Sequence, residues 1–140
     1  MHIQEQRAWF VLIVMILTLV LYGGTVALIG FQPAALAAFG FTGLAGGAPL
    51  IGRRDEKRGL VVSDERDREI SRQAVLVSFS IFWLVFIAAA LLPMFILGTE
   101  TSLNLQAGTL PAVVFPAVVL VYLVQSLTTI VLYRRGGHAE

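Results

Sequence analysis

The stretch QAVLVSFSIFWLVFIAAALLPMFILGT at residues 73–99 contains no Asp, Glu, Lys or Arg. Two other long tracts, residues 8–52 and residues 101–133, are equally free of these charged residues. A helix needs about 20 apolar residues to cross the roughly 30 Å hydrocarbon core of a bilayer. All three tracts are long enough, so the expected surroundings of most of the chain are lipid.

The composition supports a membrane protein and excludes several other classes. Hydrophobic residues make up 57% of the 140 residues and charged residues only 14%, well below the roughly one quarter usual in soluble domains. The net charge of +1 argues against nucleic acid as a partner, because a nucleic-acid-binding protein carries a basic surface. The absence of Cys excludes disulfides, thiolate metal sites and palmitoylation.

Turn-forming residues divide the tracts into four predicted spans within a single domain, residues 1–140. Gly30 and Pro33 interrupt the first tract, and Pro is tolerated in the first turn of a helix. Pro49 is expected to kink the second span near its end. The predicted spans are residues 8–29, 33–51, 74–97 and 111–133. The predicted fold is therefore an all-α integral membrane four-helix bundle, built from two antiparallel transmembrane hairpins.

The basic residues predict the orientation of these spans. All ten Lys and Arg lie in residues 7, 53–72 and 134–135, which four spans place on one side, whereas the other side carries only Glu100. Lys and Arg concentrate in cytoplasmic loops. Trp9 and Tyr133 are placed as interfacial aromatics at the same side. We therefore expect a multi-pass protein of a prokaryotic plasma membrane with both termini in the cytoplasm.

An alternative is that residues 1–37 form a cleaved signal peptide, because Ala35, Leu36 and Ala37 resemble a cleavage site. The apolar run before this site, residues 8–29, is longer than the roughly 7–15 residues of a signal peptide's apolar region. The spanning interpretation is preferred for this reason.

The cytoplasmic charged segment, residues 53–72, is expected to end in a helix that continues into the third span. Ser63 or Asp64 is placed as its N-cap, with acidic residues in the first turn, where the helix dipole favours them. No Gly or Pro separates Asp64 from Leu92, so about three turns of the third helix extend into the cytoplasm. Acids and arginines at i,i+3 or i,i+4 spacing are expected to pair along it: Asp64 and Glu65 with Arg68, and Glu69 with Arg72.

Two interpretations of this extension remain open. It is either a solvated helix that fixes topology, which we favour, or a docking surface for a partner. The surface would consist of Asp64, Glu65, Arg66, Asp67, Arg68 and Arg72. A headgroup-binding patch is less favoured, because acidic residues offset the basic ones.

The sequence SDERDREI at residues 63–70, followed by Ala74 and the aromatic residues Phe79, Phe82 and Trp83, resembles an uncharacterised family of small bacterial and archaeal membrane proteins. The resemblance covers residues 62–85. It implies four membrane helices with a DERD segment before the third. It implies no activity and transfers no catalytic residues.

Inside the spans there is no ionisable Asp, Glu, Lys, Arg or His, and such residues mark most intramembrane functional sites. Proton-coupled exchange needs a membrane carboxylate, and catalysis needs a positioned base. Both histidines, His2 and His138, lie in the tails, which excludes a bis-His haem within the membrane. We therefore expect no enzyme, cofactor or metal site; a divalent-ion site at Asp64 and Asp67 is the least favoured interpretation.

Helix packing is the remaining chemistry of the spans. Gly40, Gly43 and Gly47 lie on a small-residue surface of the second span, which allows close backbone approach. The surface packs either within the monomer or against a second copy or partner. In both cases the second span is expected to be the most enclosed helix. Gln125 is expected to turn inward and bond to Trp83, Ser80, Thr18 or a carbonyl, the alternative being its own helix or water.

The leading hypothesis for function is an accessory or interaction subunit that binds another membrane or cytoplasmic protein. It is based on two contact surfaces and the absence of catalytic chemistry. The alternative is a small-solute transport or permeation protein that works as an oligomer, with a polar seam that includes Gln125.

Overall fold

The computed structural model describes residues 3–53, 64–98 and 110–136. Within these ranges the chain forms α1 (Ile3–Ile29), α2 (Phe31–Thr42), the 3-10 helix η1 (Gly43–Leu50), α4 (Glu65–Leu97) and α5 (Leu110–Gly136). Four stretches are long and apolar enough to cross a membrane: α1, α2 together with η1, α4 and α5. The predicted all-α membrane bundle is confirmed. Ser63, Glu100, the two histidines, most of the predicted loop before α5 and residues 54–63 of the charged segment lie outside the described residues.

One residue, Gly30, separates α1 from α2 and reverses the chain. Its φ is +87°, its N–H donates to Val26 O at 3.1 Å, and its carbonyl accepts from Ala34 N–H at 3.4 Å. Glycine adopts this left-handed conformation freely, whereas other residues pay a steric penalty. The predicted interruption at Gly30 is thus the turn of the first hairpin.

Replacing Gly30 by Ala is expected to lower the free energy of unfolding by about 1–2 kcal/mol, because an L side chain is strained in this backbone conformation. A Cβ there would meet no atom within 4 Å, so the backbone alone carries the effect. The matched control is Gly23→Ala, also in open space but inside α1, where Ala favours the helix. Equilibrium unfolding in mixed detergent micelles compares the two, and equal stabilities would contradict the prediction.

The second span differs from the uniform helix expected over residues 33–51. It is α-helical to Thr42 and then tightens into the eight-residue 3-10 helix η1. Three glycines and Pro49 in GLAGGAPL explain this, because Gly and Pro are the poorest α-helix formers. A 3-10 helix rises about 2.0 Å per residue against 1.5 Å, so these 20 residues reach across the hydrocarbon core.

The apolar core lies between α1, α2 with η1, and α5. Its centre is Phe115, which is fully buried and packs against Tyr22 and Phe39 with ring centroids 4.7 and 5.6 Å away. Small residues of the second span, among them Ala38 and Ala45, allow this approach. A second cluster of Ala8, Leu12 and Ile130 joins α1 to α5 near the N-terminus of α1. These three spans therefore form a packed unit.

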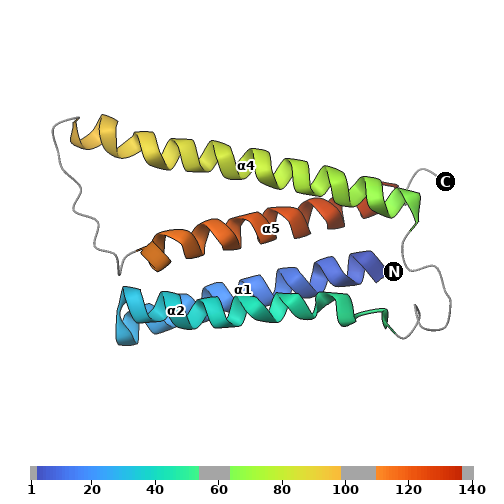
Figure 1. The fold of residues 1–140 in the computed structure, drawn as a ribbon, viewed down its shortest axis with the longest axis horizontal. Helices are drawn as coiled ribbons and strands as arrows, with labels where there is room; N and C mark the ends of the chain where they lie inside the picture. Colours follow the sequence, from blue (N-terminus) through green and yellow to red (C-terminus); the bar gives the residue numbers. More distant parts are fainter. Residues whose placement is uncertain (1–2, 54–63, 99–109, 137–140) are drawn as a thin grey trace.

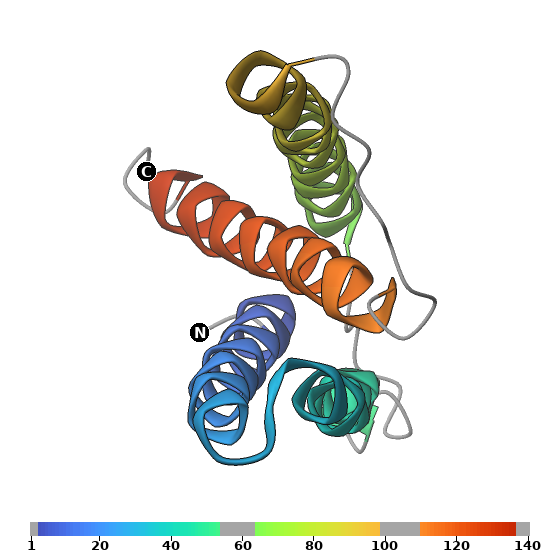
Figure 2. The same ribbon diagram turned by 90° about the vertical axis from the view of Figure 1, so that its left-hand side faces the viewer.

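Helix α4 lies outside this unit and packs on α5 from the side opposite α1 and α2 (Figures 1 and 2). Its buried residues, Asp67, Ile70, Ala74 and Ser78, follow one helical face and all lie in its first half. No side chain that the structure describes between residues 79 and 96 is buried. Only 6% of the most apolar window of α4 is buried, against 22% for α5 and for the second span, so α4 is attached at one end.

Candidate functional site

The start of α4 is fixed by two reciprocal hydrogen bonds between carboxylates and backbone. Asp67 N–H donates to Asp64 Oδ1 at 2.7 Å, and Asp64 N–H donates to Asp67 Oδ2 at 3.2 Å. This is the arrangement of a capping box, with aspartates in both positions. The predicted N-cap at Asp64 is confirmed, and α4 continues without a break from Glu65 to Leu97.

Asp67 also joins α4 to the last turns of α5. The Tyr133 hydroxyl donates a hydrogen bond to Asp67 Oδ1, and the two side chains are only 8% and 4% exposed. One carboxylate thus caps its own helix with one oxygen and holds a second helix with the other. Hydrogen bonds to a buried charge are among the stronger ones in proteins.

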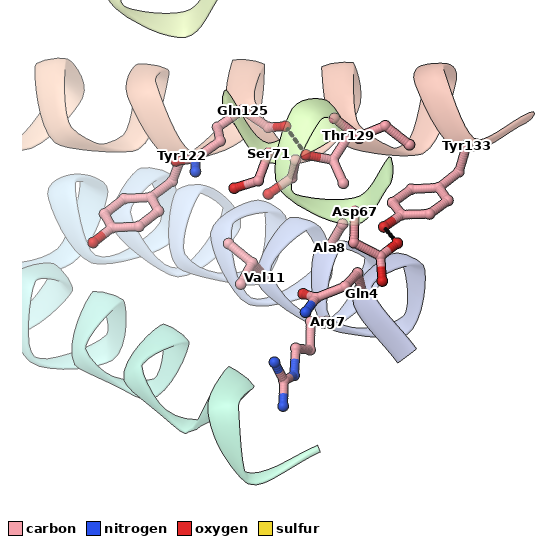
Figure 3. A pocket seen from close by; sticks show the side chains of 12 residues that line it. Gln4, Arg7, Ala8, Val11, Asp67, Ser71, Tyr122, Gln125, Thr129 and Tyr133 are labelled. Atoms are coloured by element: carbon pink, nitrogen blue, oxygen red, sulfur yellow. Dashed lines mark hydrogen bonds between the residues drawn. The ribbon is translucent and has the colours of Figure 1, made fainter. Parts of the chain in front are cut away.

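A cavity of about 170 Å³, lined by both apolar and polar side chains, lies beside this pair, between α1, α4 and α5 (Figure 3). Each helix contributes one face at helical spacing, and α5 contributes the longest. The lining residues are Gln4, Arg7, Ala8, Val11, Asp67, Ile70, Ser71, Tyr122, Gln125, Ser126, Thr129 and Tyr133. Ser71 and Tyr122 are exposed at its rim, whereas Asp67 and Ser126 are buried. The lining holds a single carboxylate and no histidine, which makes it a poor metal site.

Several described hydroxyls donate to carbonyls of their own helices, and Thr129 in the cavity does the same, to Gln125 O at 2.8 Å. Thr18, Ser78 and Ser80 donate to carbonyls of their own helices at 2.7–2.9 Å. Ser71 and Ser126 make no hydrogen bond to any residue that the structure describes, although Ser126 is only 4% exposed.

Arg7 borders the cavity, but its guanidinium binds backbone carbonyls outside it. Its Nε and Nη2 donate to the Ile51 carbonyl at 3.0 and 2.7 Å, and Nη2 also donates to the Pro49 carbonyl at 3.4 Å. Figure 3 shows the guanidinium turned away from the cavity, toward the end of η1. A cation is favoured beside the last carbonyls of a helix, so Arg7 joins α1 to the second span.

Gln125 and Trp83, which are predicted from the sequence to bond across helices, do not lie together in the structure. Gln125 does turn inward and lines the cavity near Ser71 and Thr129, but no hydrogen bond joins its side chain to another described helix. Trp83 is 47% exposed on α4, among Phe79, Phe82 and Phe86. The expected bond from Gln125 to Trp83, Ser80 or Thr18 is absent in the described part of the chain, because each hydroxyl bonds its own helix and Trp83 faces outward.

The small-residue surface of the second span is divided. Gly47 lies near Phe10, whose ring would be 3.8 Å from an added Cβ. Gly40 and Gly43 are exposed, with open space around them. Alanines, not these two glycines, form the packed face of this helix. Within the single chain the second span and α5 are equally enclosed, with 22% of each apolar window buried, so the second span is not more buried than every other helix.

The charged start of α4 is only partly the surface expected from the sequence. Asp64, Glu65, Arg66, Arg68 and Arg72 are exposed, but Asp67 is buried against α5 and is removed from that surface. Glu69 accepts a hydrogen bond from Gln73 at 3.0 Å. No ion pair within 4 Å joins Glu69 to Arg72 among the described residues, so the expected pairing does not form there.

The sequence interpretation missed the link between Asp67 and Tyr133. The signal was the face of α5 that carries Tyr122, Gln125, Ser126, Thr129 and Tyr133, spaced like one side of a helix. A polar helix face of this length near the end of a span predicts contact with water or hydrogen bonds to another helix. From the sequence, Tyr133 is predicted only to be an interfacial aromatic residue. At the same end of the bundle, the Arg134 guanidinium lies 5.5 Å from the Trp9 ring centroid.

A family model described as "Predicted membrane protein (DUF2178)" matches residues 6–135. Neither a curated protein nor a solved structure matches the chain.

Proposed function

Because the chain belongs to the DUF2178 family of predicted membrane proteins, and because α4 is left almost unpacked, we propose that it is an interaction subunit. In this proposal α4 binds a transmembrane helix of another membrane protein. The observation that carries it is the exposure of α4 beyond Ser78. The chain catalyses no reaction in this role.

The exposed half of α4 has the composition of a contact surface. Phe79, Phe82, Trp83 and Phe86 form a continuous aromatic cluster with centroids 5.6–6.3 Å apart. Trp and Phe are enriched where protein surfaces meet. In lipid, helices associate through van der Waals packing and not through hydrophobic burial, so large rings that interlock with a partner helix supply the attraction.

A photo-crosslinking amino acid in place of Trp83 tests this role in native membranes. Expected products are adducts to a second membrane protein, with a mass different from twice that of this chain. The matched control is the same substitution at Val20, which is 67% exposed on α1. Adducts with twice the mass of this chain would show that α4 contacts a second copy instead of another protein. Lipid adducts at both positions would contradict the proposal.

Oligomeric transport has less support from the geometry. Gln125 and the other polar lining residues lie at the end of the bundle that holds Arg7, the start of α4 and Arg134, hereafter the basic end. Further along α5 the buried residues are Val119, Phe115 and Ala112. A solute that entered the cavity would therefore meet an apolar core.

We further propose that the basic end faces the cytoplasm, in agreement with the distribution of Lys and Arg. The chain contains no Cys, so single-cysteine variants need no further background changes. A membrane-impermeant maleimide applied to intact cells should label Gly98→Cys, at the far end of α4. The same reagent should label Glu65→Cys only after the cells are lysed. The reverse pattern would invert the orientation.

A further inference from the structure

We propose that the partner helix that binds α4 presents a hydrogen-bond acceptor near the middle of the bilayer, where it accepts from the indole N–H of Trp83. This inference rests on the proposed interaction role and specifies the chemistry of the partner. The acceptor is the side-chain oxygen of a Ser, Thr, Asn or Gln, which are the residues that hydrogen-bond between membrane helices.

Trp83 lies deep in the apolar part of α4. The nearest charged residue along the chain is Arg72, about 16 Å away at 1.5 Å per residue, and α4 ends at Leu97, about 21 Å beyond Trp83. Half of the hydrocarbon core is about 15 Å thick, so the indole lies near the middle of the bilayer. Trp usually concentrates at the membrane surfaces, where its N–H meets water or headgroups, and Trp9 at the basic end has that usual position.

The indole N–H of Trp83 has no acceptor within the described part of the chain. No hydrogen bond joins it to another described residue, and the surrounding rings of Phe79, Phe82 and Phe86 offer only a weak N–H···π contact. The hydrocarbon core contains no water that could accept instead. A donor without an acceptor in an apolar medium costs free energy. The side chain is 47% exposed, so a second helix can reach it and remove this cost.

The acceptor has to come from another molecule, because Trp83 lies on the side of α4 that is turned away from α5. The face that packs on α5 includes the fully buried Ala74. Nine positions separate Ala74 from Trp83, which is two and a half turns at 3.6 residues per turn, so the two residues lie on opposite sides of the helix. Figure 2 shows α5 on one side of α4 and no other described helix beside it.

Rotation of α4 within the chain does not supply the acceptor. Gln125 lines the cavity on the packed side of α4, and α4 would have to turn by about half a revolution to bring Trp83 there. That turn would break the hydrogen bond between Asp67 and Tyr133 and would move the buried face of α4 into lipid.

The hydrogen bond adds specificity to a surface that otherwise binds by packing. The aromatic rings attract a helix of any apolar composition through van der Waals contact, whereas the indole N–H selects a helix with an acceptor at one depth. Hydrogen bonds between membrane helices contribute about threefold to affinity on average and up to about twentyfold. Loss of the N–H should therefore weaken binding by a factor in this range.

The test combines a photo-crosslinking amino acid in place of Phe86, whose ring contacts Trp83, with substitutions of Trp83 in the full chain. The yield of partner adducts in native membranes measures binding. Trp83→Phe keeps an aromatic ring and removes the donor, whereas Trp83→Tyr returns a donor as a hydroxyl. The matched control is Trp9→Phe, because an indole N–H lost at the membrane surface leaves acceptors that water can satisfy.

We expect the adduct yield to fall about three- to twentyfold in Trp83→Phe, to recover in part in Trp83→Tyr, and to stay unchanged in Trp9→Phe. An unchanged yield in Trp83→Phe would overturn the acceptor and leave the interaction role standing. An equal fall in both Trp83 variants would also overturn it, because ring shape would then explain the loss. Adducts with twice the mass of this chain would overturn it in favour of a second copy. Absence of protein adducts even with Trp83 intact would contradict the interaction role itself.

Discussion

Replacing Asp67 by Ala is expected to lower the free energy of unfolding by about 1.5–5 kcal/mol. The change removes a helix cap, worth about 0.5–2 kcal/mol, and leaves the buried Tyr133 hydroxyl without its carboxylate, which costs about 1–3 kcal/mol. Tyr133→Phe should cost about 1.5–3 kcal/mol, because it removes the donor to a buried charge. Equilibrium unfolding in mixed detergent micelles, followed by far-ultraviolet circular dichroism, measures both.

Matched controls separate the shared contact from general damage. Glu65→Ala removes an exposed acid from the same helical turn, and Tyr122→Phe removes an exposed hydroxyl from the same helix as Tyr133. Both should change the free energy of unfolding by less than about 0.5 kcal/mol. The double variant of Asp67 and Tyr133 should show a coupling energy of about 0.5–3 kcal/mol. Strict additivity would mean that the hydrogen bond between α4 and α5 does not contribute.

Replacing Phe115 by Ala is the second large effect expected. In soluble cores this change costs about 3–5 kcal/mol, part of which is the transfer of apolar atoms out of water. Lipid is as apolar as the core, so this transfer contribution largely disappears and the lost packing remains. We therefore expect a loss of about 2–3 kcal/mol, since the ring is fully buried against Tyr22 and Phe39.

Phe95→Ala is the matched control for this substitution. The Phe95 ring is 79% exposed on α4 and has little packing to lose within the chain. Its replacement should leave the free energy of unfolding of the isolated protein within about 0.5 kcal/mol. The comparison is made in the same micelles, and a Phe115→Ala variant as stable as Phe95→Ala would place the core elsewhere.

The sequence predicted the spans well because their cause is local. Each span or helix boundary is determined by residues close to it in the sequence. Examples are an uncharged run of about 20 residues, Gly30 at a turn and Asp64 before a helix. The second span was predicted as one continuous helix because hydropathy does not distinguish an α-helix from a 3-10 helix. Its glycines and Pro49 carried that information through their weak helix propensity.

The contacts between helices were harder to predict, because they depend on how each helix is rotated about its axis. Gln125 and Trp83 lie a similar number of residues from the charged ends of their predicted spans. In the structure, however, Gln125 lines a cavity and Trp83 faces outward. Asp67 was grouped with its exposed neighbours, although its spacing with Ile70 and Ala74 marks a separate, buried face. The polar face of α5 indicates that a contact exists, but no local pattern identifies Asp67 as the partner of Tyr133, 66 residues away in the sequence.

The central position of Phe115 has a consequence for biogenesis. The core that this ring completes is built from α1, α2 and α5, and α5 follows α1, α2 and α4 in the chain. During synthesis α1 and α2 can form their hairpin early, but their inner faces have no third helix to pack against. Helix α4 enters the bilayer in that interval, before α5, the helix on which it packs, has been inserted. Assembly of this core therefore waits for the insertion of α5.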